Sequence, residues 1–144
     1  MRRLLAIVLI LCLVAPVRPT SPAVVLVVRD DSPVTDLDSV TLRKLFLGLP
    51  VLVNGNQLRA LRDRSDPQLD EIFLQQIVAM SQSSYDRQLL ILMNRQRALR
   101  PPEFYGTPQL VAALSADPNA VSFMWLRDVG HNPKLRIIRV IWGE

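Results

Sequence analysis

A short apolar run at residues 24–28 is the first segment of the chain whose pattern predicts a regular element. Four of its five residues are valine, and Asp31, Ser32 and Pro33 follow it closely. A short apolar run that is rich in β-branched residues and ends in turn-forming residues is typical of a buried strand. It is too short to span a membrane. The pattern therefore predicts a strand over 24–28 with a turn directly after it.

A short helix is predicted after this turn. Three apolar residues recur at positions i, i+3 and i+4 and would share one helical face: Leu42, Leu45 and Phe46. Asp38 or Ser39 provides an N-cap side chain. Gly48 favours the left-handed conformation that ends many helices. The segment from about residue 39 to residue 47 is therefore expected to be helical.

Strand patterns occur again further along the chain. Asn54 and Gly55 form the dipeptide that favours a tight hairpin turn, and residues 51–53 and 57–61 on its two sides suggest short strands. Two later apolar segments are each preceded by a proline turn. The predicted strands are 51–53, 57–61, 121–126 and 135–142.

Three helices are predicted between these strands. Asp66 followed by Pro67 is typical of an N-cap and a first helical residue, and the next apolar residues keep helical spacing: Leu69, Ile72, Phe73, Ile77 and Met80. After residues 81–84, a second helix carries one apolar face: Tyr85, Leu89, Leu92 and Met93. A third, short helix begins at Thr107. We expect Phe46 and Phe73 to be buried against one sheet that contains 24–28 and 121–126.

The first 23 residues have the layout of a signal peptide. Arg2 and Arg3 precede an apolar stretch over 4–17, and Ser21 and Ala23 place small residues at the −3 and −1 positions of a cleavage site. A retained membrane anchor is the alternative, although a span needs about 20 apolar residues. We therefore expect residues 1–23 to be a cleaved signal peptide. Residues 24–144 would then be one periplasmic domain with no stable membrane span.

Loss of this segment changes the charge and the cysteine content. The whole chain has 17 Lys plus Arg and 13 Asp plus Glu, and residues 1–23 hold Arg2, Arg3 and Arg18 but no acid. The mature domain would keep 14 basic and 13 acidic residues, a net charge of +1. Cys12, the single cysteine, would also be lost, so no disulfide is expected. Export and a nearly neutral charge argue against nucleic acid as a partner.

The order of these elements resembles the substrate-binding proteins of phosphate ABC transporters. The strand, the Ser-Pro-Val turn at 32–34, the short helix and the Phe-Leu-Gly ending at 46–48 carry the resemblance. The prolines at 101–102 and the segment 117–123 continue it, so that it extends from about residue 24 to residue 138. The chain looks most like the short members with a single lobe. The resemblance implies an α/β fold, in which one three-layer lobe has a mixed sheet flanked by helices, as in a type 2 periplasmic binding protein.

The resemblance also indicates where a ligand would bind. The full-length relatives use an arginine and a Ser-Gly-Thr-type loop that opens a helix, and residues 62–68 take that place here. We name Arg64, Ser65 and Ser32 as the candidate ligand-binding residues. The loop lacks the glycine and the second hydroxyl, Pro67 removes one N–H group, and Asp66 adds a carboxylate where an anion would lie. The alternative is an ordinary capped helix with solvated arginines.

Two functions remain open from the sequence. The first is a periplasmic solute-binding-like protein that binds phosphate or another inorganic oxyanion as a transport accessory. One lobe gives a ligand only an open face, so this function favours an envelope or transporter protein as partner. The second is a protein–protein interaction module of the cell envelope that has kept the lobe and lost the ligand. The state of loop 62–68 distinguishes the two functions. Free N–H groups in this loop would favour ligand binding, whereas a loop filled by the Asp66 side chain would favour the interaction module.

No catalytic residue, metal site or cofactor is predicted. His131 is the single histidine and lies in a proline turn, whereas metal sites need clustered ligands. Ser32 lacks the sequence context of a nucleophile elbow. The four aspartates between residues 30 and 38 lack the spacing of a calcium loop. Four arginines form a basic patch on and after the second helix: Arg87, Arg95, Arg97 and Arg100. Such a patch leaves two kinds of partner possible, an anionic lipid surface or an acidic protein.

Overall fold

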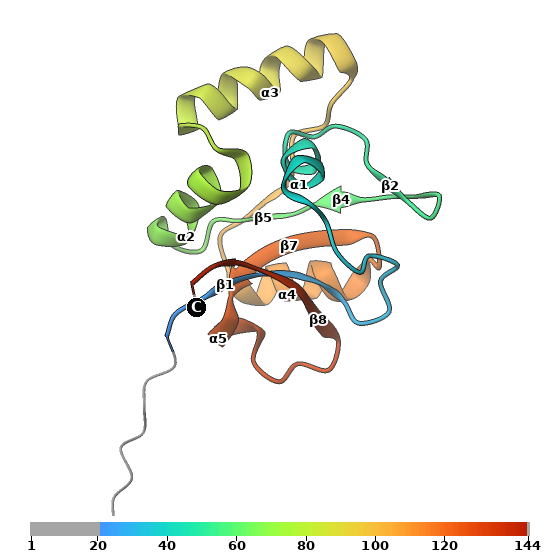
Figure 1. The fold of residues 1–144 in the computed structure, drawn as a ribbon, viewed down its shortest axis with the longest axis vertical. Helices are drawn as coiled ribbons and strands as arrows, with labels where there is room; N and C mark the ends of the chain where they lie inside the picture. The colour runs from blue at the N-terminus through green and yellow to red at the C-terminus, as the bar shows by residue number, and fades with distance from the viewer. Residues whose placement is uncertain (1–20, 144) are drawn as a thin grey trace, which may run out of the picture.

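The strand β1 (Val24–Arg29) is central in a four-stranded sheet, in a computed structural model that describes residues 21–143. The strand order is β4-β7-β1-β8, where β4 is Arg59–Ala60, β7 is Ala120–Trp125 and β8 is Leu135–Trp142 (Figure 1). β1 is antiparallel to β7 and β8, whereas β4 is parallel to β7. The predicted mixed α/β fold is confirmed. Most of the predicted signal peptide, residues 1–20, lies outside the described residues.

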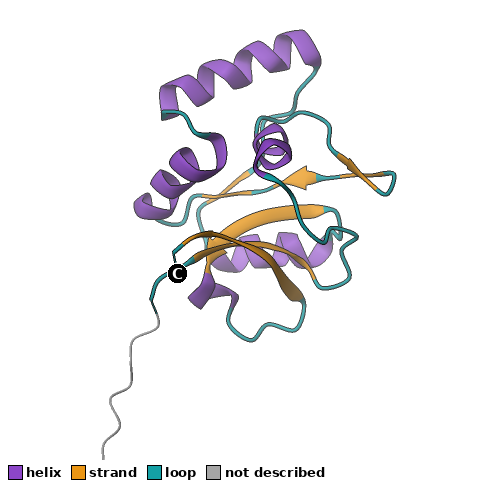
Figure 2. Ribbon diagram, in the orientation of Figure 1, coloured by secondary structure: helices purple, strands orange, loops and turns teal. Residues whose placement is uncertain are grey.

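Helices cover both faces of this sheet (Figure 2). Alternate residues of β1 face opposite sides, because side chains alternate along a strand. Val24, Leu26 and Val28 join the core below α1 (Ser39–Phe46), α2 (Pro67–Ile72) and α3 (Gln82–Gln96). Val25 and Val27 pack toward α4 (Thr107–Ala116) on the other face. The sheet is therefore the middle of three layers, as the resemblance implies.

Four aromatic rings form the centre of the larger core. Phe46 and Phe73 are fully buried, and their ring centroids lie 5.5 Å apart in an edge-to-face arrangement. Phe123 of β7 contacts both rings, at 5.6 Å and 5.1 Å. The Tyr85 hydroxyl donates a hydrogen bond of 2.6 Å to the Phe46 carbonyl oxygen, which ties α3 to the end of α1. The predicted burial of Phe46 and Phe73 against this sheet is confirmed.

The segment between α1 and α2 differs in part from its prediction. β2 (Leu52–Val53) and β3 (Asn56–Gln57) form the hairpin around Asn54 and Gly55, both of which have positive φ. Residues 57–61 are not one strand, because the chain leaves the hairpin at Leu58 and pairs with β7 through β4. The next residues form a separate parallel pair, β5 (Arg62–Asp63) with β6 (Glu103–Phe104).

Side-chain caps fix the ends of the three helices on the larger core. Asp38 accepts from the Thr41 N–H at 2.8 Å and Asp66 from the Leu69 N–H at 2.9 Å, which confirms both predicted caps. Ser81 caps α3 through the Ser84 N–H. Gly48 has a φ of +77°, and a Cβ there would lie 2.1 Å from the Leu99 carbonyl oxygen. Glycine is therefore required by both conformation and space.

Two helical details were not predicted. α2 continues as the π-helix η1 (Phe73–Val78), which ends where Ala79 adopts a left-handed conformation, so Met80 lies beyond the helix. The apolar face of α3 is formed by Tyr85, Leu89 and Leu92, but Met93 is 38% exposed. One residue after Leu92 is rotated by about 100°, which turns Met93 away from the core. The prediction that Met93 shares the buried face was therefore wrong.

Candidate functional site

The loop between β5 and α2 lies at the end of the sheet where β1 begins and β7 ends. The strand register places Val24 of β1 opposite Trp125 of β7. The Trp125 indole N–H donates a hydrogen bond to Asp66 Oδ2, so the start of α2 lies beside this end of β7. The loop that the sequence indicated as the ligand site is therefore positioned by two elements far apart in the chain.

The Asp66 carboxylate occupies the N-terminus of α2. Its Oδ1 accepts from the Leu69 N–H, while its Oδ2 accepts from Trp125. Partial burial alone would raise the pKa of Asp66. These two hydrogen bonds, together with the Gln68 N–H and the charge of Arg127, outweigh it and hold the pKa below its usual value. Asp66 is therefore an anion that this helix end already holds.

Arg62 is buried in the core. Its side chain is 1% exposed, and its guanidinium carbon lies 4.4 Å from the ring centroid of Phe73 and 5.1 Å from that of Tyr85. Arg62 Nη2 donates to Asp70 Oδ1 at 2.6 Å and to Gln82 Oε1 at 2.9 Å. Its Nε and Nη1 have no hydrogen-bond partner. The alternative of an ordinary capped helix with solvated arginines therefore does not describe Arg62.

Arg64 is the more accessible arginine of the loop, with 29% of its side chain exposed. Its Nη1 donates to Glu103 Oε2 at 2.9 Å and its Nη2 to Asp70 Oδ2 at 3.1 Å. Burial alone would raise the pKa of Glu103, but hydrogen bonds from Arg64 and Tyr105, together with the charges of Arg64 and Arg62, outweigh it and lower that pKa. The two arginines thus face two carboxylates, Asp70 and Glu103, and the cluster has no net charge to attract an anion.

Ser65 is adjacent to Arg64, and its N–H donates to Asp63 Oδ1 at 2.9 Å. Asp63 itself is fully buried, and its Oδ2 has no hydrogen-bond partner. Burial raises the pKa of Asp63, and the charges of Asp128 and Asp66 act in the same direction. The surroundings of Ser65 are therefore acidic.

Ser32 lies at the other end of the sheet. Ser32 follows the end of β1, where the last residue pair with β7 is Val28 with Val121. The loop with Arg64 lies near Trp125, at the start of β1. The two ends of this six-residue strand are separated by about 16 Å. The Ser32 hydroxyl accepts from the Val34 N–H at 3.2 Å, within its own turn. The structure thus brings Arg64 and Ser65 together and places Ser32 elsewhere.

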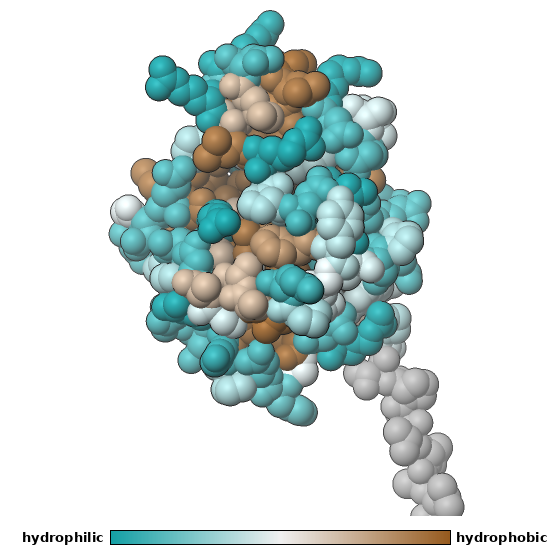
Figure 3. Space-filling model, turned by 180° about the vertical axis from the view of Figure 1, so that it is seen from behind, coloured by the Kyte–Doolittle hydropathy of each residue, from teal (hydrophilic) through white to brown (hydrophobic). Residues whose placement is uncertain are grey.

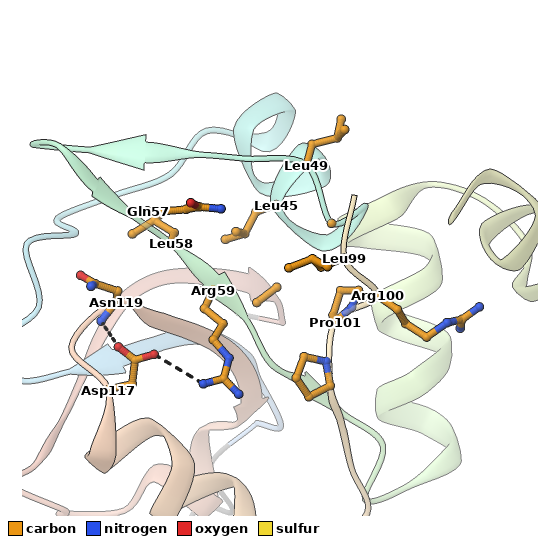
Figure 4. Close-up of a pocket in the computed structure, with 13 residues that line it drawn as sticks. Leu45, Leu49, Gln57, Leu58, Arg59, Leu99, Arg100, Pro101, Asp117 and Asn119 are labelled. Atoms are coloured by element: carbon orange, nitrogen blue, oxygen red, sulfur yellow. Dashed lines mark hydrogen bonds and ion pairs between the residues drawn. The ribbon is translucent and has the colours of Figure 1, made fainter. Parts of the chain in front are cut away.

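A groove with a volume of about 570 Å³ lies between α1, β4 and the segment after α3 (Figure 4). Its walls are mainly apolar, with Leu45, Leu58 and Leu99 among them. Arg59 Nη1 approaches Asp117 Oδ2 at 3.8 Å on one side of the groove. None of the predicted ligand residues lines this groove.

Neither a metal-binding group of side chains nor a membrane-spanning helix is found in residues 21–143. In this part of the chain, no group of three or more His, Cys, Asp or Glu side chains is placed to hold a metal ion. None of its helices combines the length and the hydropathy needed to cross a membrane.

Two important residues of the site were missed by the sequence analysis. Trp125 and Glu103 contact the loop only because β7 and β6 lie beside it in the fold. Neither residue stands at a recognisable spacing from Asp66 or Arg64. Only a knowledge of the strand order could have indicated them.

The fold of this chain is similar to part of several solved transport proteins. The chain is similar to an ABC-type phosphate transport receptor from Vibrio cholerae, with 15% identity and a TM-score of 0.56. It is also similar to a putative phosphate ABC transporter substrate-binding protein with bound phosphate from Clostridium perfringens, with 13% identity and a TM-score of 0.62. A third similar structure is PstS from Borrelia burgdorferi, with 11% identity and a TM-score of 0.58. No family model and no curated protein matches the chain.

These matches cover most of this chain and less than half of each similar protein. The match to the Vibrio cholerae receptor covers 83% of this chain and 46% of that protein. The corresponding values are 83% and 45% for the Clostridium perfringens protein, and 82% and 47% for the Borrelia burgdorferi protein. The chain therefore has the fold of part of a phosphate ABC transporter substrate-binding protein. At this level of identity the likeness concerns the fold.

Proposed function

We propose that this chain is an exported, solute-binding-like accessory of a phosphate-type transport system, which acts through contact with another protein of the cell envelope. The Asp66 carboxylate carries the proposal. It accepts hydrogen bonds from Leu69 and Trp125 and so fills the helix N-terminus at which an anion would bind. Oxyanion capture by the lobe alone is therefore disfavoured.

The charges around the loop support the same function. The guanidinium groups of Arg62 and Arg64 are engaged by Asp70 and Glu103, and the buried Asp63 lies next to Ser65. An oxyanion at this place would have to displace Glu103 from Arg64 and approach Asp66. Both steps cost electrostatic free energy, because like charges repel more strongly where water is partly excluded.

Direct oxyanion binding by Arg64 and Ser65 is the second candidate function. Two observations favour it: the fold is shared with a protein that has bound phosphate, and Arg64 is still 29% exposed. Ser32, the third predicted contact, would have to act with a second molecule or lobe because it lies at the opposite end of the sheet. Such binding would be weak in an open site.

Isothermal titration with phosphate, sulfate and molybdate distinguishes the two functions. The test uses wild type, Arg64→Ala and Asp66→Gly, with Asp38→Gly as a matched control that removes a similar N-cap from α1. The accessory function predicts that wild type and the control show no saturable heat up to millimolar anion. A gain of binding in Asp66→Gly alone would support the view that this carboxylate blocks the site.

The outcome that overturns the proposal is saturable binding by wild type. In that case Arg64→Ala should weaken the affinity by roughly one to two orders of magnitude, since a charge-assisted hydrogen bond contributes about 1.5–3 kcal/mol. The oxyanion-binding function would then replace the accessory function.

A further inference from the structure

The outer face of α3 exposes apolar side chains that the proposed function does not use. Leu90 is 55% exposed, and Ile91 and Met93 are each 38% exposed, whereas the opposite face of the helix is buried. α3 lies at one extreme of the molecule (Figure 1), and apolar atoms at that extreme are flanked by long polar side chains (Figure 3).

Three arginines flank these apolar residues: Arg87, Arg95 and Arg97. All three are exposed, and within residues 21–143 none of them forms an ion pair. The single acid of α3, Asp86, is held by Arg100 Nη1 at 3.3 Å. α3 and the residue directly after it therefore carry three positive charges without counter-charges in the described part of the chain.

We propose that the outer face of α3 binds the surface of an anionic phospholipid bilayer. Arg87 and Arg95 are eight residues apart on α3, about 12 Å along its axis, and Arg97 is the left-handed residue directly after the helix. A broad, deformable anionic surface can meet all three at once. Leu90 and Ile91 lie between them and can enter the apolar region below the lipid headgroups, as aliphatic residues of interfacial helices do.

The charge and shape of α3 favour lipid over a folded acidic protein. Leu90 and Ile91, the exposed apolar residues between the arginines, are aliphatic, whereas protein interfaces are enriched in aromatic anchors that fill pockets. Membrane binding also needs no residue of the Asp66 loop. The inference therefore goes beyond the proposed accessory function and can fail independently of it.

Vesicle co-sedimentation tests the proposal with protein recovered after export, from which residues 1–23 are expected to be removed, because their apolar stretch would itself bind vesicles. One set of vesicles contains phosphatidylcholine with a minor fraction of phosphatidylglycerol, and the other contains phosphatidylcholine alone. The test variant carries Arg87→Gln, Arg95→Gln and Arg97→Asn. The control removes the same charge elsewhere, through Arg43→Gln, Lys44→Gln and Lys134→Gln, which are also exposed and unpaired within residues 21–143.

We expect wild type and the control variant to bind the phosphatidylglycerol vesicles at low salt and to be released by high salt. Each arginine near an anionic surface contributes roughly five-fold in affinity, so the test variant should bind about 100-fold more weakly. Leu90→Ser should also weaken binding, with an unchanged salt dependence. Circular dichroism and urea midpoints check that each variant is folded.

Three results would overturn the proposal. Wild type could fail to bind phosphatidylglycerol vesicles even at low salt, which would leave an acidic protein as the partner of this face. Equal losses in the test and control variants would show a non-specific attraction of the whole protein. Equal binding to both kinds of vesicle would show that the arginines are not involved.

Discussion

Arg62→Ala is expected to destabilise the protein more than any loss of a surface charge. The side chain is 1% exposed and donates to Asp70 at 2.6 Å and to Gln82 at 2.9 Å. Removing one partner of a buried ion pair typically costs about 3–5 kcal/mol of unfolding free energy. Here Asp70 would keep the hydrogen bond from Arg64 Nη2 at 3.1 Å, which moderates the loss. A domain of this size has a total stability of about 5–15 kcal/mol.

Two features of the site set this magnitude. The guanidinium lies between the Phe73 and Tyr85 rings, and cation–π contacts in desolvated places contribute about 2 kcal/mol. Against this, Arg62 Nε and Nη1 are buried without hydrogen-bond partners, and each such donor costs about 1–3 kcal/mol. Asp70 is also 19% exposed, so water will partly solvate it in the variant. The lower part of the range, about 3 kcal/mol, is therefore expected.

Urea denaturation of Arg62→Ala, Arg62→Met and Arg59→Ala measures this effect. Methionine fills the space between the two rings and carries no unpartnered donor. Arg62→Met should therefore lose less unfolding free energy than Arg62→Ala. Arg59 is 58% exposed and its pair with Asp117 spans 3.8 Å, so its replacement should cost at most about 1 kcal/mol. The reasoning is refuted if Arg62→Ala costs no more than Arg59→Ala, or if methionine is the worse replacement.

Three further predictions concern the core, the pH dependence and the N-terminus. Phe46→Ala and Phe73→Ala should each cost about 3–5 kcal/mol in urea unfolding, and unchanged midpoints would contradict the observed packing. Because the folded pKa of Asp63 is raised above 3.8, the native state loses stability as pH rises from that value through the raised pKa. Asp63→Asn should therefore become more stable relative to wild type as pH rises over this range. A pH-independent difference in unfolding free energy between the two proteins would contradict the raised pKa of Asp63. Ala23 is buried and its carbonyl oxygen accepts from Leu126 at 2.8 Å, so a folded precursor should resist cleavage after Ala23 while an unfolded one is cut. N-terminal sequencing of exported protein should give Val24, and a start at Met1 would refute processing.

Elements defined by neighbouring residues were predictable from the sequence. The strand at β1, the Asp38 and Asp66 caps and the stop at Gly48 each depend on side chains within one or two turns of the chain. Local propensity and spacing contain that information. The family resemblance, carried by the order of these elements, agreed with the fold that the structure shows.

Features set by long-range packing could not be predicted. Arg62 follows Leu61 in a segment of mixed polarity, and its burial depends on Phe73, Tyr85 and Asp70, which only the fold brings together. Ser32 and Arg64 were grouped because the register of β1 and β7 was unknown. That register places them at opposite ends of the sheet.

An NMR titration of the amides of Asp66, Gln68 and Leu69 with phosphate tests the central claim most directly. The Leu69 N–H is already bonded to the Asp66 carboxylate at 2.9 Å, so it is not free to bind an added anion. At constant ionic strength and pH, we expect these resonances to stay in place up to millimolar phosphate. Saturable shifts at these amides, lost in Arg64→Ala, would contradict the account and show that the loop binds an oxyanion.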